Sequence, residues 1–181
     1  MRGLYFRLFV LIALTLGIDQ ATKRLVIDNL HLGETFRPIP ALAPYFQITR
    51  SFNTGAAFGI FPQSGVLFTL IAVGVVIMLI ALYPRFTSGA ARVGIGLVCG
   101  GALGNVIDRV TYNAVVDFIH YQIPGVISNV SNLADHAIVF GVLIIVADSW
   151  RRDSKPAADE LTPTDDAKPA TIRIESNPTE D

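Results

Sequence analysis

Four long apolar stretches constrain this chain more than any other feature of its sequence. A helix needs about 20 consecutive, mostly apolar residues to cross the roughly 30 Å hydrocarbon core of a bilayer. Stretches of this kind occur at about residues 4–27, 65–83, 90–110 and 132–150. The composition agrees, because only 16% of the 181 residues are charged, whereas soluble domains have about a quarter. The sequence therefore predicts an all-α membrane protein with four transmembrane helices.

The first apolar stretch allows a second interpretation, that of a cleaved signal peptide. Arg2 and Arg7 precede its apolar run, as basic residues do in a signal peptide. No clear A-x-A cleavage site follows, however, and Asp19 and Lys23 come at helical spacing. We therefore interpret the stretch as an uncleaved span.

The distribution of Lys and Arg predicts the orientation of the spans. Basic residues flank the chain start, crowd the second connection and follow the fourth span: Arg2, Arg7, Arg85, Arg92, Arg151, Arg152 and Lys155. The last loop, residues 111–133, contains no Lys or Arg. The positive-inside rule then places both termini in the cytoplasm and both longer loops outside.

Two further segments have a character of their own. Residues 36–52 combine prolines, aromatic residues and β-branched residues with partial alternation, which predicts a small β-rich element in the outer loops. Residues 153–181 are polar, acidic and proline-bearing, which is typical of a disordered cytoplasmic tail. We expect residues 1–152 to form one membrane domain.

Composition also excludes several kinds of function. A net charge of -1 provides no basic field for nucleic acid. The single Cys99 excludes an internal disulfide and a multi-cysteine metal site. His31, His120 and His136 do not form the H-E-x-x-H motif of zinc proteases. We therefore expect neither a metal nor another cofactor.

Charged residues occur where a bilayer disfavours them. A charge at the centre of a span costs about 2.5–3.5 kcal/mol on insertion scales, so such residues usually serve a function. Asp19 and Lys23 are four residues apart and share one helix face. They either neutralise one another for insertion or brace a site, and we favour the second interpretation.

A row of small residues leads to another carboxylate in the third span. Gly96, Gly100 and Gly104 are each four residues apart, and the row continues to Asp108. Such a row lets a neighbouring helix approach closely. Asp108 and the following Arg109 would either form an ordinary pair that closes the helix or shape a nearby site. We favour the second interpretation.

Two more carboxylates lie near the outer ends of the spans. Asp117 interrupts an apolar loop segment, AVVDFIHY, where a merely solvated carboxylate is unusual. Asp135 opens the fourth span, and Asn132 would then be its N-cap. A carboxylate in the first turn favours the helix dipole, so capping alone explains Asp135 without catalysis.

Four motifs that follow one another along the chain favour a functional role for these carboxylates. They are FNTGAAFG (52–59), GNVIDR (104–109), VVDFI (115–119) and SNLADHAI (131–138), preceded by DQATK (19–23). Together they resemble the signature motifs of the lipoprotein signal peptidase family, also called signal peptidase II, over about residues 5–150. The resemblance implies a membrane aspartic endopeptidase of the bacterial inner membrane. Its substrates would be diacylglyceryl-modified prolipoproteins, cleaved just before the lipidated cysteine.

The resemblance also implies roles for particular residues. Asp117 and Asp135 match the two catalytic aspartates. The residues that match substrate-binding or supporting positions are Asn53, Asn105, Asp108, Arg109, Asn132, Ala134, Asp19 and Lys23. Two departures from the family's usual last motif are Ser131 before Asn132 and His136 after Asp135, and His136 adds a titratable group beside the pair.

Two carboxylates suffice for peptide hydrolysis. Held together, they cannot both ionise cheaply and so share one proton. The ionised member activates a water, and the protonated member donates to the carbonyl oxygen, so no metal is required.

The partners that the resemblance implies are membrane lipids and prolipoproteins with a lipid-modified lipobox cysteine. We expect the protein to be a monomer.

Two other functions fit individual features. An ion-coupled or proton-coupled transporter would explain buried acids and a glycine-rich helix, but it predicts polar residues near the bilayer middle. Here Asp19, Asp108 and Asp135 cluster at one end of the spans. A membrane scaffold would use the glycine row as a partner surface, but it gives no reason for Asp117 to lie in an apolar loop.

Overall fold

The computed structural model describes residues 2–55 and 64–153. These residues form four long helices: α1 (Arg2–Asn29), α2 (Ser64–Leu82), α3 (Gly89–Tyr112) and α4 (Leu133–Asp153). Each is long and apolar enough to cross a membrane, as predicted. The predicted tail, apart from the helical Asp153, and residues 56–59 of the first motif lie outside the described residues.

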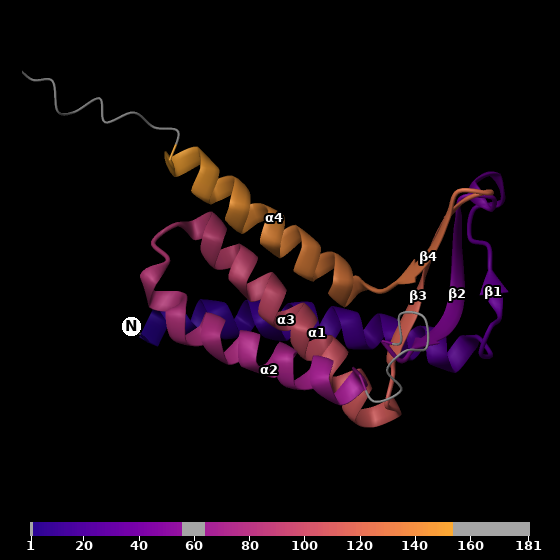
Figure 1. The fold of residues 1–181 in the computed structure, drawn as a ribbon, viewed down its shortest axis with the longest axis horizontal. Coiled ribbons are helices and arrows are strands. Elements are labelled where there is room, and N and C mark those ends of the chain that lie inside the picture. Colours follow the sequence, from indigo (N-terminus) through magenta and orange to yellow (C-terminus); the bar gives the residue numbers. More distant parts are fainter. Residues whose placement is uncertain (1, 56–63, 154–181) are drawn as a thin grey trace, which may run out of the picture.

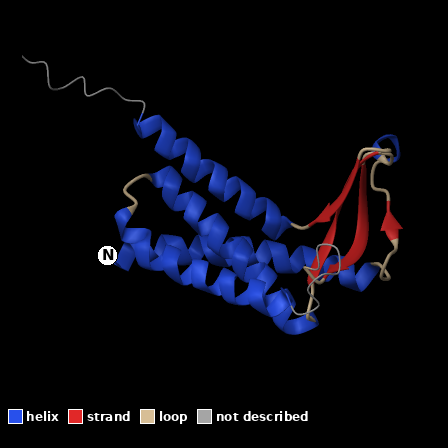
Figure 2. Ribbon diagram, in the orientation of Figure 1, coloured by secondary structure: helices blue, strands red, loops and turns tan. Residues whose placement is uncertain are grey.

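A four-stranded antiparallel sheet covers one end of the helices (Figures 1 and 2). Its strands are β1 (Thr35–Phe36), β2 (Phe46–Asn53), β3 (Val115–Ile123) and β4 (Ile127–Ser131), arranged in chain order. Two single-turn 3₁₀ helices complete the described elements, η1 (Pro40–Leu42) and η3 (Tyr83–Arg85). The predicted β-rich element therefore exists, but half of its strands come from the last loop.

The helix α3 lies at the centre of the bundle because its glycines permit close packing. In its apolar window 61% of the residues are buried within the protein, against 6% in α2. A Cβ built on Gly100 would lie 2.6 Å from the Cβ of Thr15 in α1. On another side, a Cβ on Gly94 would lie 2.6 Å from the carbonyl oxygen of Gly141 in α4. The sequence predicts that the glycine row lets a neighbouring helix approach closely, and in the structure that helix is α1.

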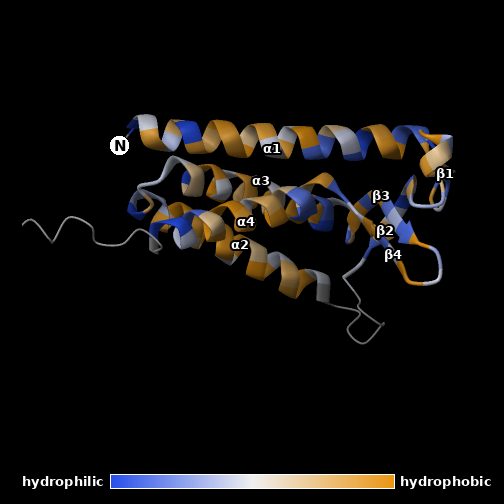
Figure 3. Ribbon diagram, turned by 90° about the horizontal axis from the view of Figure 1, so that it is seen from above, coloured by the Kyte–Doolittle hydropathy of each residue, from blue (hydrophilic) through white to orange (hydrophobic). Residues whose placement is uncertain are grey.

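Apolar side chains divide between the bundle interior and its outer surface. The interior cluster includes Leu8, Ile12, Ile95 and Cys99, the last a fully buried packing residue. Large apolar residues also cover the outside of the helices, and Figure 3 shows hydrophobic segments along all four. An apolar exterior of this extent is what a lipid environment requires. The fold is that of a multi-pass membrane protein.

The strands carry particular residues from the sheet to the helix ends. After α3, Asn113 adopts the left-handed conformation (φ 54°) that Asn tolerates well, and its N–H donates to the carbonyl of Arg109 at 3.0 Å. The chain then reverses into β3, in which Asp117 lies opposite Ser51 of β2. At the far edge, β4 ends next to the start of α4. The sheet therefore positions Asp117 near the first turn of α4.

Candidate active site

Six polar or charged residues are almost fully buried where the helices meet the sheet. They are Asp19, Lys23, Asn105, Asp108, Asp117 and Asn132, each at most 6% exposed. Burying a charge is costly unless it is paired and hydrogen-bonded. The contacts of these six residues therefore show which charges are compensated and which are not.

The ammonium group of Lys23 compensates two carboxylates at once. Its Nζ lies 2.8 Å from Asp19 Oδ2 and 2.7 Å from Asp108 Oδ2, and it donates to Asn105 Oδ1 at 3.0 Å. Its three N–H groups thus have three acceptors. Asp19 and Lys23 form an ion pair within α1, and Lys23 also links α1 to α3 through Asp108 and Asn105. Asp108 pairs with Lys23 rather than with Arg109, the partner that an ordinary helix-closing pair requires.

The two carboxylates around Lys23 also hold the backbone beside the candidate catalytic residues. Asp108 Oδ2 accepts the N–H of Val116 at 3.0 Å, and Asp19 Oδ1 accepts the N–H of Ala134 at 2.9 Å. Each of these donors immediately precedes one of the two candidate catalytic aspartates. Ala134 is itself completely buried, so its contribution is packing and this N–H.

Gln20 belongs to the same cluster, although it is not among the site residues predicted from the sequence. Its Nε2 donates to Asp108 Oδ1 at 2.9 Å, and to Asp19 Oδ2 and the carbonyl of Gly104 at 3.2 Å each. The one sequence signal for Gln20 is its place in the DQATK motif. Gln20 thus links α1 to α3 through Asp108 and Gly104.

Asp117 and Asp135 have amide partners instead. Asp117 accepts from Asn132 Nδ2 at 2.6 Å and from Asn53 Nδ2 at 3.0 Å, and Asp135 Oδ1 accepts from Asn105 Nδ2 at 2.8 Å. Asn132 and Asn105 also contact each other, since Asn132 Nδ2 donates to Asn105 Oδ1 at 3.2 Å. None of the ion pairs found among the described residues includes either aspartate.

Burial without a directly paired cation changes the acidity of Asp117. Its side chain is 2% exposed, and burial raises its pKa from 3.8 to about 6. The two asparagine donors and the positive charge of Lys23 lower this pKa, while the nearby charge of Asp135 raises it further. A carboxyl of this kind can hold a proton close to neutral pH, as a proton-sharing acid pair requires.

The start of α4 answers the capping question that the sequence left open. Asn132 is the N-cap, because its Oδ1 accepts the N–H of Asp135 at 2.9 Å. Asp135 is the third residue of α4, as the capping interpretation predicts. Its carboxylate takes no part in the cap, however, and accepts from Asn105. Capping therefore explains the position of Asp135 but not the contact of its side chain.

His136, the titratable residue next to Asp135, contacts the backbone and the sheet. Its Nδ1 lies 2.6 Å from the carbonyl oxygen of Asn132, and its Nε2 lies 2.9 Å from the hydroxyl of Tyr121. A carbonyl oxygen only accepts, so Nδ1 carries a hydrogen. His136 thus ties the first turn of α4 to β3.

Arg109 lies at the border of the site, half-buried. Its Nη1 donates to the carbonyl of Asn105 at 3.5 Å, and its guanidinium lies 5.9 Å from the ring centroid of Phe68. It also attracts the carboxylates of the site, Asp135 most strongly. Arg109 lines a cavity of about 810 Å³ together with Thr54, Gly65, Val66, Leu67, Thr69, Leu70, Val110 and Asn113.

Comparisons with known proteins agree on one family. Residues 11–151 match the family model described as signal peptidase (SPase) II. The lipoprotein signal peptidase of Pelotomaculum thermopropionicum is 42% identical over 142 residues, which cover 76% of this chain and 88% of that protein. The lipoprotein signal peptidase of Bacillus subtilis is 39% identical over 144 residues, with coverages of 78% and 90%.

Solved structures of bacterial membrane enzymes share the fold. One, determined by the in meso method at 2.3 Å resolution, superimposes with a TM-score of 0.74 at 30% sequence identity and covers 86% of this chain and 94% of its own. Another, determined at 1.9 Å resolution, has a TM-score of 0.71 and 31% identity, with coverages of 79% and 92%.

Proposed function

The chain belongs to the signal peptidase II family, and from this premise we propose that Asp117 and Asp135 are its two catalytic carboxylates. The protein is an aspartic endopeptidase of a bacterial membrane, and it removes the signal peptide from prolipoproteins. This identity decides against the transporter and the scaffold as its primary function. The roles that we propose for individual residues rest on the geometry of the site.

The observation that carries the assignment is the absence of an ion-pair partner at Asp117 and Asp135 among the described residues. Asn53, Asn105 and Asn132 orient the two carboxylates without adding charge. Burial of Asp117 and the nearby charge of Asp135 raise the pKa of Asp117, which supports our proposal that the two carboxylates share one proton. We assign neither carboxylate as the acid or the base.

With one proton shared by Asp117 and Asp135, the steps of peptide hydrolysis follow. The ionised carboxylate takes a proton from a water molecule as the water oxygen attacks the carbonyl carbon of the scissile peptide. The protonated carboxyl donates its proton to the carbonyl oxygen, giving a tetrahedral diol. The diol then returns a proton to the pair, the C–N bond breaks, and the leaving nitrogen takes up a proton as the amine. General acid and base catalysis of this kind contributes typically about 10²–10⁴-fold.

The substrate class we propose is a prolipoprotein whose lipobox cysteine already carries a diacylglyceryl group, with cleavage just before that cysteine. The cavity beside Arg109 supports this class, because most of its other lining residues are apolar or small and come from α2 and α3. A lipid chain on the substrate can enter such a cavity from the bilayer. We assign substrate binding to Arg109, which lines this cavity, and to Asn53, which directly precedes the lining residue Thr54.

We also propose that the sheet and the acid pair lie at the periplasmic face. The opposite end of the bundle carries the basic residues of the short connection and of both ends of the described chain: Arg2, Arg7, Arg85, Arg92, Arg151 and Arg152. The positive-inside rule assigns that end to the cytoplasm. A reporter fused after Trp150 should then be active only as a cytoplasmic reporter, and periplasmic activity would contradict this orientation.

The substrate assignment is tested with purified protein and two forms of one precursor. We expect the diacylglyceryl-modified precursor to be cut before its cysteine, as a gel shift and mass spectrometry would show. The unmodified precursor should be cut much more slowly, and the Asp117→Asn variant should cut neither. Equal cleavage of both forms would contradict the requirement for the lipid group. A monomer is expected in detergent by light scattering.

A further inference from the structure

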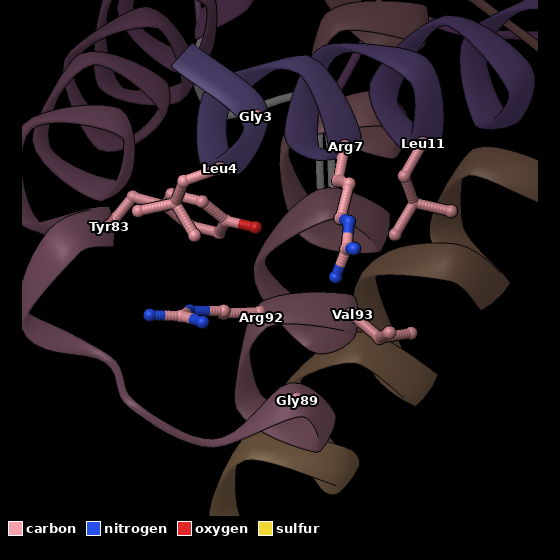
Figure 4. A pocket seen from close by; sticks show the side chains of 8 residues that line it. All are labelled: Gly3, Leu4, Arg7, Leu11, Tyr83, Gly89, Arg92 and Val93. Carbon is pink, nitrogen blue, oxygen red and sulfur yellow. The ribbon is translucent and has the colours of Figure 1, made fainter. Parts of the chain in front are cut away.

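A second cavity lies at the end of the bundle remote from the sheet. It has a volume of about 490 Å³ and lies between the first turns of α1, the single-turn helix η3 and the first turn of α3 (Figure 4). The lining residues are Gly3, Leu4, Arg7, Leu11, Tyr83, Gly89, Arg92 and Val93. This cavity takes no part in the proposed peptide hydrolysis, so it needs an explanation of its own.

Two arginines of this cavity form no ion pair with any of the described residues. None of the residues lining it is acidic, and none of the ion pairs found in the described chain includes Arg7 or Arg92. At the same end of the bundle, in contrast, Arg152 Nε lies 3.0 Å from Asp148 Oδ2. The cavity therefore concentrates positive charge that the described protein does not neutralise.

The surroundings of Arg92 indicate a site rather than a solvated surface charge. Its Nε is shielded from solvent and has no hydrogen-bond partner within the described residues. Its guanidinium lies 5.9 Å from the ring centroid of Tyr83, and in Figure 4 Arg7 reaches from α1 toward the same space. A shielded donor without an acceptor costs stability, and an anion bound here would satisfy it.

The chemistry of the lining selects the kind of anion. A guanidinium offers a planar fork of donors that matches the oxygens of a phosphate group. The other lining residues include Leu4, Leu11 and Val93, and Val93 is 46% exposed on the outer surface of the helix. A ligand that suits both parts has a phosphate group and apolar chains. Basic pockets between transmembrane helices are known to bind anionic lipid headgroups.

We propose that this cavity binds the phosphate group of an anionic phospholipid between Arg7 and Arg92. The acyl chains lie along the apolar outer surface that α1 and α3 present to the bilayer. The lipid joins the start of α1 to the start of α3 at the end opposite the acid pair, and it stabilises the folded bundle by binding there. The site is independent of Asp117 and Asp135.

The test is thermal unfolding of the purified full chain in mixed micelles. Dioleoyl phosphatidylglycerol should raise the Tm saturably, whereas dioleoyl phosphatidylcholine and inorganic phosphate at equal concentration should raise it much less. Arg7→Gln and Arg92→Gln should each weaken the apparent affinity for phosphatidylglycerol about tenfold, the loss expected for one charge-assisted contact. The matched control is Arg85→Gln, which removes the same charge from the same end outside this cavity.

Each result decides for or against the site. Equal loss of affinity in Arg85→Gln and Arg7→Gln would show that only the general charge of this end attracts the lipid, and it would overturn the proposal. Stabilisation by inorganic phosphate as large as that by phosphatidylglycerol would overturn the lipid as the ligand. Arg7 is exposed, so Arg7→Gln keeps the test decisive even where Arg92→Gln fails to accumulate as folded protein.

Discussion

Two groups of carboxylates lie side by side in this protein, and they differ in what compensates them. Asp19 and Asp108 surround Lys23 at 2.8 and 2.7 Å. Asp117 and Asp135 accept hydrogen bonds from asparagines and have no ion-pair partner among the described residues. The first group, which together with Lys23 we call the brace, shares a single ammonium. We propose that the second group retains the ability to exchange a proton. On this proposal, an aspartate serves structure where a cation contacts it and chemistry where none does.

Asn105 lies between the two groups and keeps them distinct. Its Oδ1 accepts from Lys23, and its Nδ2 donates to Asp135. An amide can act as donor on one side and acceptor on the other without carrying charge. A basic residue at this position would place a positive charge beside Asp135. An acidic residue would add a third negative charge to Asp117 and Asp135.

The largest expected effect of breaking this contrast is on turnover. Asp117→Asn, Asp135→Asn and the double variant should each lose about 10²–10⁴-fold or more in turnover, and the losses should not add, because the two groups act as a unit. All three proteins should remain folded and inserted. Cleavage of a diacylglyceryl-modified precursor, followed by gel shift, measures the loss.

Capping as the sole role of Asp135 predicts a different result for the same variant. Asn is a tolerable residue in the first turn, so Asp135→Asn would then cost at most about 1 kcal/mol of stability and keep most of its turnover. A thermal-unfolding measurement on each variant separates loss of stability from loss of chemistry. Retention of most turnover in Asp135→Asn would show that the two-carboxylate mechanism is wrong.

The next largest effect is on stability, at the brace. Lys23→Ala leaves two buried carboxylates without their cation, and breaking a buried ion pair costs about 3–5 kcal/mol. Asp19→Ala should be milder, because Lys23 keeps Asp108 as a partner. The double change Asp19→Ala/Lys23→Ala should recover part of the loss but not all of it, since Asp108 remains.

The amount of folded protein and its Tm in detergent measure these differences. Arg24→Gln is a suitable control, because Arg24 and Asp28 form an exposed ion pair at the same i,i+4 spacing. Such exposed pairs contribute about 0–1 kcal/mol. If Asp19→Ala and Lys23→Ala showed losses that simply added in the double variant, Lys23 and Asp19 would not be coupled.

A smaller effect is expected from disturbing the packing of α1 against α3, which holds Asp19 and Lys23 next to Asp108. Gly100→Leu should push α1 away from α3, because even a Cβ at this position would lie 2.6 Å from the Cβ of Thr15. Overpacking typically costs about 1–3 kcal/mol. The matched control is Gly74→Leu in α2, where a Cβ would meet nothing within 4 Å. Equal accumulation and activity of the two variants would contradict the close α1–α3 contact.

The brace shows how far the sequence predicts a buried cluster. Local spacing is sufficient to pair Asp19 with Lys23, because residues four apart in a helix share a face. The third partner, Asp108, comes from another helix. The sequence favours a role for Asp108 in shaping the site over a pair with Arg109, but it does not identify Lys23 as its partner. Gln20 was missed because its partners lie 84 and 88 positions away along the chain. Contacts between helices depend on how the helices rotate against each other, which the spacing within one helix does not determine.

The sheet and the start of α4 show a similar division. The sequence predicts extended structure in residues 36–52, and β2 forms there. It treats Asp117 as a loop residue, because an apolar run alone does not reveal a strand that pairs with a distant segment. At α4 the N-cap Asn132 is correctly predicted from local sequence. Its second contact, to Asp117 across the sheet, depends on tertiary structure.

The protonation of Asp117 tests the contrast between the two groups most directly. Isotope-edited infrared spectroscopy of the Asp117 carboxyl in the purified full chain gives its titration, and we expect an apparent pKa of about 6. Because this pKa is raised in the folded state, the folded protein binds the proton more tightly, and Asp117's contribution to stability declines as the pH rises from 3.8 toward 6. In Asp135→Asn the pKa should fall, since the charge of Asp135 helps to raise it. A pKa near the ordinary 3.8, unchanged in Asp135→Asn, would contradict a shared proton between Asp117 and Asp135.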